Sequence, residues 1–424
     1  MALNDRLGLS TDSEGLLARV RERFLRSGDF NGLHFQGTDV EPLRAAAIEL
    51  LQAGLIEITT GEDYPNIHIR PWPSRRPMED QKEDLLSLGP DDYGVCLYPT
   101  PAGMRGVRLP RRLDGRPFAR AMARGKGTLE LAYFEFDVLE QYRNDSRFMF
   151  GFGEFGASMS LSDEASLDPS APERDHVFLN HIGFAYDLSR YDPEKPDSPI
   201  LRRVAVFYSD LKTLTPEHQR RWETYQVPDT DLEPHPLWWN GQMGTWPDGV
   251  GPFTRIFMEL ENLNELADLA FDRPLFRSTE RPADLGWILR PSQREWDDFV
   301  REMDKVLSEN LISKFFDAAF VLKTDESGQH LGTLTRLELF MEMHGVDADR
   351  AKHAVSPLKE VRAERQAPSH RLRTNITDQT FIHRQIQLVE RVYSALGAIR
   401  QWLATHPRCS EWREKYPDLK TYML

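Results

Sequence analysis

The sequence predicts an α+β protein built from several domains, and three observations lead to this expectation. The chain has 424 residues, more than a single hydrophobic core usually organises. Its central part contains short apolar segments with the alternation of strands, and its last third contains longer segments with the apolar periodicity of helices. We expect an N-terminal unit at residues 1–72, a central mixed domain at 73–290 and an antiparallel four-helix bundle at 291–424.

The composition indicates a globular protein of a reducing compartment. Hydrophobic residues make up 40% of the chain and charged residues 28%, which is typical of folded proteins. The two cysteines, Cys96 and Cys409, cannot by themselves form a disulfide framework or a cysteine-based zinc site. The N-terminus lacks signal-peptide features, and no apolar run reaches the roughly 18 residues of a membrane span. We therefore expect a cytoplasmic protein that does not enter membranes.

The charge is negative overall but unevenly distributed. The formal net charge is -14, yet residues 331–424 carry 15 basic and 11 acidic side chains. The basic excess is concentrated between Arg350 and Arg391, with nine basic and four acidic residues. A basic segment on an acidic protein is a candidate site for a polyanion. The alternative is a solvated helix face without a ligand.

The first 72 residues have an element order that resembles a winged-helix unit. A helix is expected from Ser13 to Leu25 and a second from Asp39 to Ala53, followed by strands at 55–59 and 67–70. The segment holds 7 basic and 11 acidic residues, and its second helix contains one arginine, Arg44. Because phosphate contacts supply most nonspecific affinity for DNA, we expect a structural or protein-contact role for this unit.

The central domain is expected to contain strands near 95–98, 128–136, 159–162 and 201–208, with helices at 216–222 and 254–270. Gly151, Gly153 and Gly156 match the spacing of a dinucleotide-binding loop, but a strand-like segment follows where a helix is required. A glycine-rich hairpin is the better interpretation, and we expect neither a cofactor nor a metal. The aromatic segment 237–246 could stack bases, although packing on a core is the favoured interpretation.

Four amphipathic segments form the last third of the chain. The first begins at Ser292, where Ser292 and Glu295 have the spacing of a capping box. The others are expected at 333–343, 347–366 and 378–404, and the apolar positions of each lie on one face. Short links between such helices predict an antiparallel bundle.

One arginine–histidine pair occupies a distinctive place in this bundle. Arg365 and His370 lie at the end of the third helix, before the long last one, with polar Gln366 directly after the arginine. Two other pairs have similar spacing, Arg174–His181 and Arg400–His406, so the spacing alone is not specific. The position in a basic segment between two bundle helices is the distinguishing feature.

On these residues, segment 291–424 resembles the HEPN superfamily of helical nucleotide-binding domains and ribonucleases. Its hallmark is an arginine and a histidine four to six residues apart, before the bundle's final helix. The resemblance implies that Arg365 and His370 are catalytic, that the partner is RNA and that two bundles pair as a homodimer. It also suggests supporting roles for Gln366, Arg362, Asn375 and His383, and nucleic-acid contacts for Arg371 and Arg373.

The chemistry of this residue pair suits RNA cleavage without a metal. Histidine titrates near neutral pH and can accept the proton of a 2′-hydroxyl group. Arginine keeps its charge and offers forked donors to a phosphate. The resemblance to toxins and anti-phage effectors implies an RNA endonuclease that is controlled by N-terminal sensing domains, through a ligand or a protein partner. The alternative is a non-enzymatic interaction protein, or a winged-helix DNA-binding regulator with a silent bundle.

Overall fold

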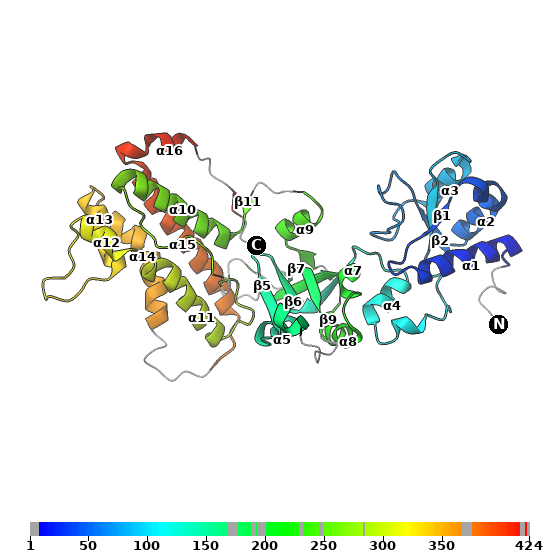
Figure 1. Ribbon diagram of the computed structural model, residues 1–424, viewed down its shortest axis with the longest axis horizontal. Coiled ribbons are helices and arrows are strands. Elements are labelled where there is room, and N and C mark those ends of the chain that lie inside the picture. Colours follow the sequence, from blue (N-terminus) through cyan, green and yellow to red (C-terminus); the bar gives the residue numbers. More distant parts are fainter. Residues whose placement is uncertain are drawn as a thin grey trace. The chain divides into compact units, whose positions relative to one another are not determined.

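The computed structural model describes residues 8–167, 177–187, 192, 195, 201–228, 232–245, 249–282, 285–366, 375–415 and 420–421. These residues form both helices and sheets, as expected for an α+β chain (Figure 1). The chain divides into two compact units. Unit 1 comprises Met1–Met149, Met159–Ile182 and Ala205–Thr230. Unit 2 comprises Phe150–Ser158, Gly183–Val204 and Asp231–Leu424.

The N-terminal part of unit 1 consists of three helices and a small antiparallel sheet. Its elements are α1 (Thr11–Arg26), β1 (Leu33–Phe35), α2 (Val40–Gln52), β2 (Ile56–Thr59), α3 (Met78–Ser87) and β3 (Val95–Pro99). Helix α1 begins after Ser10, whose side chain accepts a hydrogen bond from Ser13 N at 3.3 Å. Strand β3 lies between β1 and β2 and pairs antiparallel with both. The apolar faces of α1 and α2 are buried in the same core as this sheet.

The strand expected at 67–70 is replaced by turns. Its place beside β2 is taken by β3, with Ile58 opposite Leu97. Ile67 and Arg70 are both buried, and side chains rather than a ladder hold the segment. Tyr98 Oη donates to Ile67 O at 2.9 Å, and Arg70 pairs with Glu57 at 2.6 Å. The expectation was wrong because the alternation of apolar residues suggested a strand. The segment is instead held by the buried ion pair between Arg70 and Glu57.

The central elements span both units. Strands β4 (Leu131–Glu135), β5 (Phe148–Phe152), β6 (Gly156–Leu161), β7 (Phe178–Asp187), β8 (Leu201–Phe207), β9 (Gln226–Val227) and β10 (Glu233–Pro234) belong to one sheet. Its order is β5-β6-β7-β8-β4-β9, and β10 pairs with β7. The short helices include α4 (Pro117–Ala123), α5 (Glu140–Asn144), α6 (Asp163–Leu167), α7 (Tyr208–Leu211), α8 (Pro216–Thr224) and α9 (Pro236–Gln242).

The glycine-rich segment forms a hairpin, as predicted. Gly153 N donates to Gly156 O at 2.8 Å between β5 and β6. The turn presents Glu154, whose carboxylate accepts hydrogen bonds from Phe253 N at 3.2 Å and from Thr254 N. These amides begin helix α10 (Pro252–Phe271), so a carboxylate lies where the helix dipole favours negative charge.

His235, just before α9, is a buried and titratable part of this region. Its ring stacks on Phe155 at 3.6 Å between centroids, and Nδ1 accepts a hydrogen bond from Leu237 N at 3.2 Å. Nε2 is buried without a hydrogen-bond partner among the described residues. Burial therefore lowers the pKa of His235 to about 4, from an ordinary value of 6.5.

Acid is expected to destabilise unit 2 through this histidine. Because its pKa is lower in the folded protein, the unfolded chain binds the proton first as the pH falls below 6.5. The contribution of His235 to the free energy of unfolding is fully present above pH 6.5 and is lost as the pH falls toward 4. At pH 5 the free energy of unfolding is lower by about 2 kcal/mol. The His235→Asn variant, which keeps a capping acceptor, should lose less stability between pH 7 and pH 5 in urea unfolding. Equal losses in variant and wild type would contradict this assignment.

Helices dominate the C-terminal part of unit 2. They are α10, α11 (Gln293–Asp304), α12 (Ser313–Ala318), α13 (Thr333–Met343), α14 (Ala348–Gln366), α15 (Thr380–Ala404) and α16 (Ser410–Lys415). Helix α14 packs against α11, α13 and α15, and α10 packs along the other side of α15 (Figure 1). Helix α10 thus joins the helices that were expected to form the bundle. No helix among the described residues is long and apolar enough to cross a bilayer.

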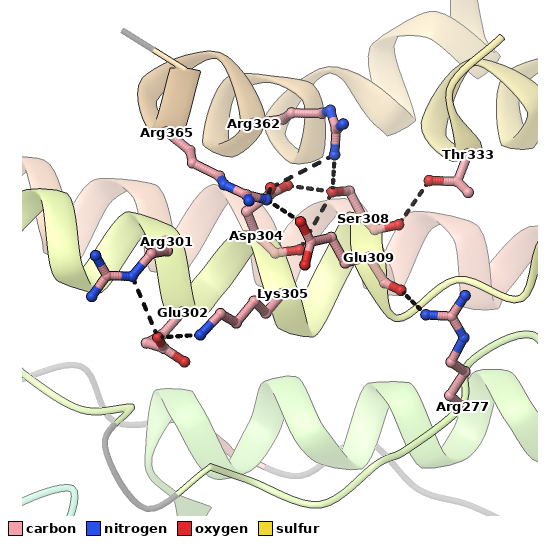
Figure 2. A network of polar contacts seen from close by, with 10 residues as sticks. All are labelled: Arg277, Arg301, Glu302, Asp304, Lys305, Ser308, Glu309, Thr333, Arg362 and Arg365. Atoms are coloured by element: carbon pink, nitrogen blue, oxygen red, sulfur yellow. Dashed lines mark hydrogen bonds and ion pairs between the residues drawn. The ribbon is translucent and has the colours of Figure 1, made fainter. Parts of the chain in front are cut away.

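The end of α11 deviates from a regular helix. Ser292 Oγ accepts a hydrogen bond from Glu295 N at 3.4 Å, which confirms the predicted start of this helix. The residues that directly follow it, Lys305–Glu309, form a π-helical turn. Such a turn widens the helix, and it is often found at functional sites. Figure 2 centres on this turn and on the final turn of α14.

Candidate functional site

Two arginines near the end of α14 converge on the π-helical turn. Arg362 and Arg365 are three positions apart and therefore lie on one face of the helix. Both side chains point toward Asp304 and Ser308 (Figure 2). The candidate site is therefore formed by two helix ends that are distant in sequence, and we call these four residues together with Glu309 the Asp304 cluster.

Asp304 is the centre of the cluster and is completely buried, with a side-chain exposure of 0%. Arg365 Nη1 pairs with its carboxylate, and Arg362 Nη1 lies 3.6 Å from the same oxygen. Ser308 Oγ donates to the other carboxylate oxygen and accepts from Arg362 Nη1 at 2.8 Å. A buried carboxylate needs such partners, because removing it from water without them is costly.

The π-helical turn explains why these groups meet. It directs Asp304, Ser308 and Glu309 toward α14, so that Glu309 also pairs with Arg365 Nη1. Its carbonyl groups find partners outside the helix (Figure 2): Thr333 Oγ1 donates to Ser308 O at 2.7 Å, and Arg277 Nη1 donates to Glu309 O. The altered hydrogen bonding is thereby satisfied, as buried backbone groups require.

The electrostatics of the cluster are balanced. Two guanidinium groups face two carboxylates, and hydrogen bonds to Asp304 and then Glu309 raise the pKa of Arg365 above its usual value. The arginines are only partly covered, with exposed fractions of 33% for Arg365 and 42% for Arg362. Glu309 is the more accessible acid, at 45%. An incoming anion would therefore compete with Glu309 before it competed with Asp304.

Several basic residues of the segment 350–391 are paired within the bundle. Lys359 pairs with Glu338, Arg384 with Glu364 at 3.0 Å, and Arg391 with Glu360 at 2.6 Å. The basic excess of the sequence therefore does not amount to a row of free cations. This pairing supports the solvated-face interpretation for these positions.

The structure places the predicted residues in different surroundings. Arg362 and Arg365 meet, whereas Asn375 Oδ1 accepts a hydrogen bond from Arg294 N at 3.0 Å, at the start of α11. His383 is buried in α15, and Gln366 is the last residue of α14. Three predicted residues, His370, Arg371 and Arg373, lie outside the described residues.

The sequence analysis missed the acidic half of the cluster. Asp304, Ser308 and Glu309 lie at the end of a helix whose start was recognised from its capping box. The available signal was an aspartate on the apolar face of that helix, next to Met303 and near Val306 and Leu307. A carboxylate at such a position requires a buried cation or donor, and this requirement alone could have singled it out.

Comparisons with protein-family models, with curated proteins and with solved structures found no match for this chain. No group of three or more histidine, cysteine, aspartate or glutamate side chains is placed to share a metal ion in the part of the chain that the structure describes. The site therefore has to be interpreted from its own chemistry.

Proposed function

We propose that the helical bundle is a metal-independent RNA endonuclease in which Arg365 and His370 act on a phosphodiester. The observation that carries this proposal is the convergence of two partly exposed guanidinium groups, Arg362 and Arg365, at the end of α14. Forked donors of this kind bind phosphate as well as carboxylate. His370 follows Arg365 after four intervening residues, and histidine is the residue type best suited to act as a base near neutral pH.

The proposed reaction is an internal transfer. His370 accepts the proton of the 2′-hydroxyl group, whose oxygen attacks the adjacent phosphorus. The bond from phosphorus to the 5′-oxygen breaks, and that oxygen takes up a proton. The products are a 2′,3′-cyclic phosphate and a 5′-hydroxyl end. Arg365 and Arg362 would stabilise the charge that grows on the phosphoryl oxygens, with Glu309 displaced by the substrate.

The proposal extends to regulation. In the cluster, Arg365 is held by two carboxylates, and in the proposed nuclease this pairing would correspond to a resting state. We propose that the bundle acts as a homodimer and that a ligand or protein partner of the preceding domains releases it. An effector of this type would serve as a toxin or in defence against phage.

A second candidate is a non-enzymatic interaction protein, and the balanced charge of the Asp304 cluster favours it. In that case Arg365 and Arg362 neutralise a buried carboxylate and bind nothing else. The DNA-binding version of this candidate has less support. Arg44 donates to Leu86 O at 2.9 Å and Leu88 O at 2.7 Å, and Arg70 is buried against Glu57. Neither arginine is available to a phosphate.

The test is cleavage of labelled single-stranded RNA by the purified full-length chain in EDTA. We expect cleavage in the presence of the chelator, with 2′,3′-cyclic phosphate ends detected by their resistance to direct 3′ ligation. The assay is repeated with cell extract to supply a trigger. Intact RNA under both conditions would favour the interaction protein, and cleavage abolished by EDTA would contradict the proposed chemistry.

A further inference from the structure

A second cationic feature lies in unit 1, whereas every residue discussed as catalytic belongs to unit 2. It is an open hollow of about 480 Å³ between the start of α4 and helix α8. Eight residues line it: Gly115, Arg116, Pro117, Arg120, Ala121, Arg124, Arg220 and Glu223. Four guanidinium groups thus face one carboxylate. Among the lining residues the arginines outnumber the acids by three, and such an imbalance favours an anion.

The local sequence is unusually basic. Between Arg105 and Lys126 the chain has eight basic residues and a single acid, Asp114. Residues 1–330 carry a large negative charge as a whole, and that average concealed this segment from the sequence analysis. Arg116, Arg120 and Arg124 recur every four residues and therefore follow one face of α4. Helix α8 contributes Arg220 from the opposite side of the hollow.

Hydrogen bonds and ion pairs orient three of these arginines, but their acidic partners neutralise them only weakly. Arg116 Nη1 donates to Leu214 O at 2.8 Å, which fixes its direction. Arg120 pairs with Asp114 at 3.4 Å and Arg220 with Glu217 at 3.3 Å, and all four of these side chains are substantially exposed. Exposed pairs of this kind are worth little and can exchange partners.

Arg124 and Gly115 add to this picture. The Arg124 side chain is exposed and has neither an ion pair nor a hydrogen bond among the described residues. Gly115 has a φ of +70°, and a Cβ atom there would lie 2.7 Å from Arg220 Nη1. The glycine thus allows the Arg220 guanidinium to lie directly over the loop that begins α4.

We propose that this hollow binds the oligophosphate group of a small molecule. Its volume suits a small ligand, and several arginines around one space match several neighbouring phosphate groups. None of the eight lining residues is aromatic, so a base would find no stacking surface there. Recognition would therefore rest on the phosphates. This site is separate from the proposed nuclease centre, and neither proposal depends on the other.

The test is isothermal titration of the full-length chain with inorganic tripolyphosphate, in parallel with orthophosphate and a short single-stranded RNA. We expect saturable binding of tripolyphosphate, tighter than that of either alternative. The double variant Arg120→Ala/Arg124→Ala should weaken it by at least about tenfold, because each charged hydrogen bond contributes on the order of a factor of ten. Circular dichroism and melting confirm that the variant is folded.

Arg108→Ala is the matched control, since this exposed arginine belongs to the same basic segment but does not line the hollow. Its affinity for tripolyphosphate should stay within about twofold of wild type, because Arg108 does not line the hollow and the charge of an exposed side chain is screened by salt. If Arg108→Ala weakens tripolyphosphate binding as much as the double variant does, the anion is attracted by the general positive charge of the segment and not by the hollow. That result would overturn the proposal. Binding of RNA but not tripolyphosphate through Arg120 and Arg124, or binding of neither, would also overturn it.

Discussion

Replacing Arg365 or His370 by alanine should lower RNA cleavage by at least about a hundredfold, the usual effect of losing a general base or a charge-stabilising donor. The reason is that the two side chains have separate roles. Without His370 the proposed acceptor of the 2′-hydroxyl proton is lost, and without Arg365 the phosphoryl oxygens lose one of their two proposed guanidinium donors. The measurement is the single-turnover rate on labelled RNA, under whichever condition activates the wild-type chain.

Arg391→Ala is the control for this experiment. It also removes an arginine that joins α15 to α14, through the exposed ion pair with Glu360, but it lies outside the Asp304 cluster. Its cleavage rate should equal that of the wild type. If a folded Arg365→Ala/His370→Ala variant cut RNA as fast as this control, the proposed catalytic pair would be wrong.

Removing both arginines of the cluster should cause the largest loss of stability. Arg362→Ala/Arg365→Ala leaves the buried Asp304 carboxylate with Ser308 as its remaining hydrogen-bond donor among the described residues. An uncompensated buried charge costs about 3–5 kcal/mol. Adding Asp304→Asn to this variant should recover most of that loss, because a neutral amide needs no cation. Urea unfolding of the three proteins measures both steps.

The comparison for this series is Arg301→Ala/Arg391→Ala. These arginines form exposed ion pairs with Asp298 and Glu360, each at 2.6 Å. Exposed pairs contribute at most about 1 kcal/mol each, so the control should remain near wild-type stability. Similar stability of the cluster variant and this control, or no recovery on adding Asp304→Asn, would show that the arginines do not stabilise Asp304.

The two experiments also separate the two candidate functions. Both functions require the cluster to be stable, but only the nuclease requires Arg365 and His370 for a reaction. If the Arg362→Ala/Arg365→Ala variant is less stable but the wild type cleaves no RNA, Arg362 and Arg365 have a structural role only. Loss of cleavage by His370→Ala, a residue outside the Asp304 cluster, would assign chemistry to this end of α14.

The helices were predictable because the information is local. Apolar residues at helical spacing predicted α10 and α15 to within a few residues, and the Ser292–Glu295 pair predicted where α11 begins. The turn between β5 and β6 followed from its glycines. In each case a short stretch of sequence determines which face is buried or which backbone angles are accessible.

The chain by itself therefore determined its coarse α+β class, its longer helices, and the arginine half of the Asp304 cluster. Only the tertiary structure decided which charges neutralise one another. Arg365 meets Asp304, which is 61 positions away. The arginine-lined hollow joins α4 and α8, whose residues Ala119 and Gln219 are 100 positions apart. Apolar periodicity in the sequence shows which face of a single helix or strand is buried. The partner of a charged side chain depends instead on how separate elements pack together. For this reason, counting charges in the sequence cannot distinguish an arginine in an ion pair from an arginine that is free to bind a ligand.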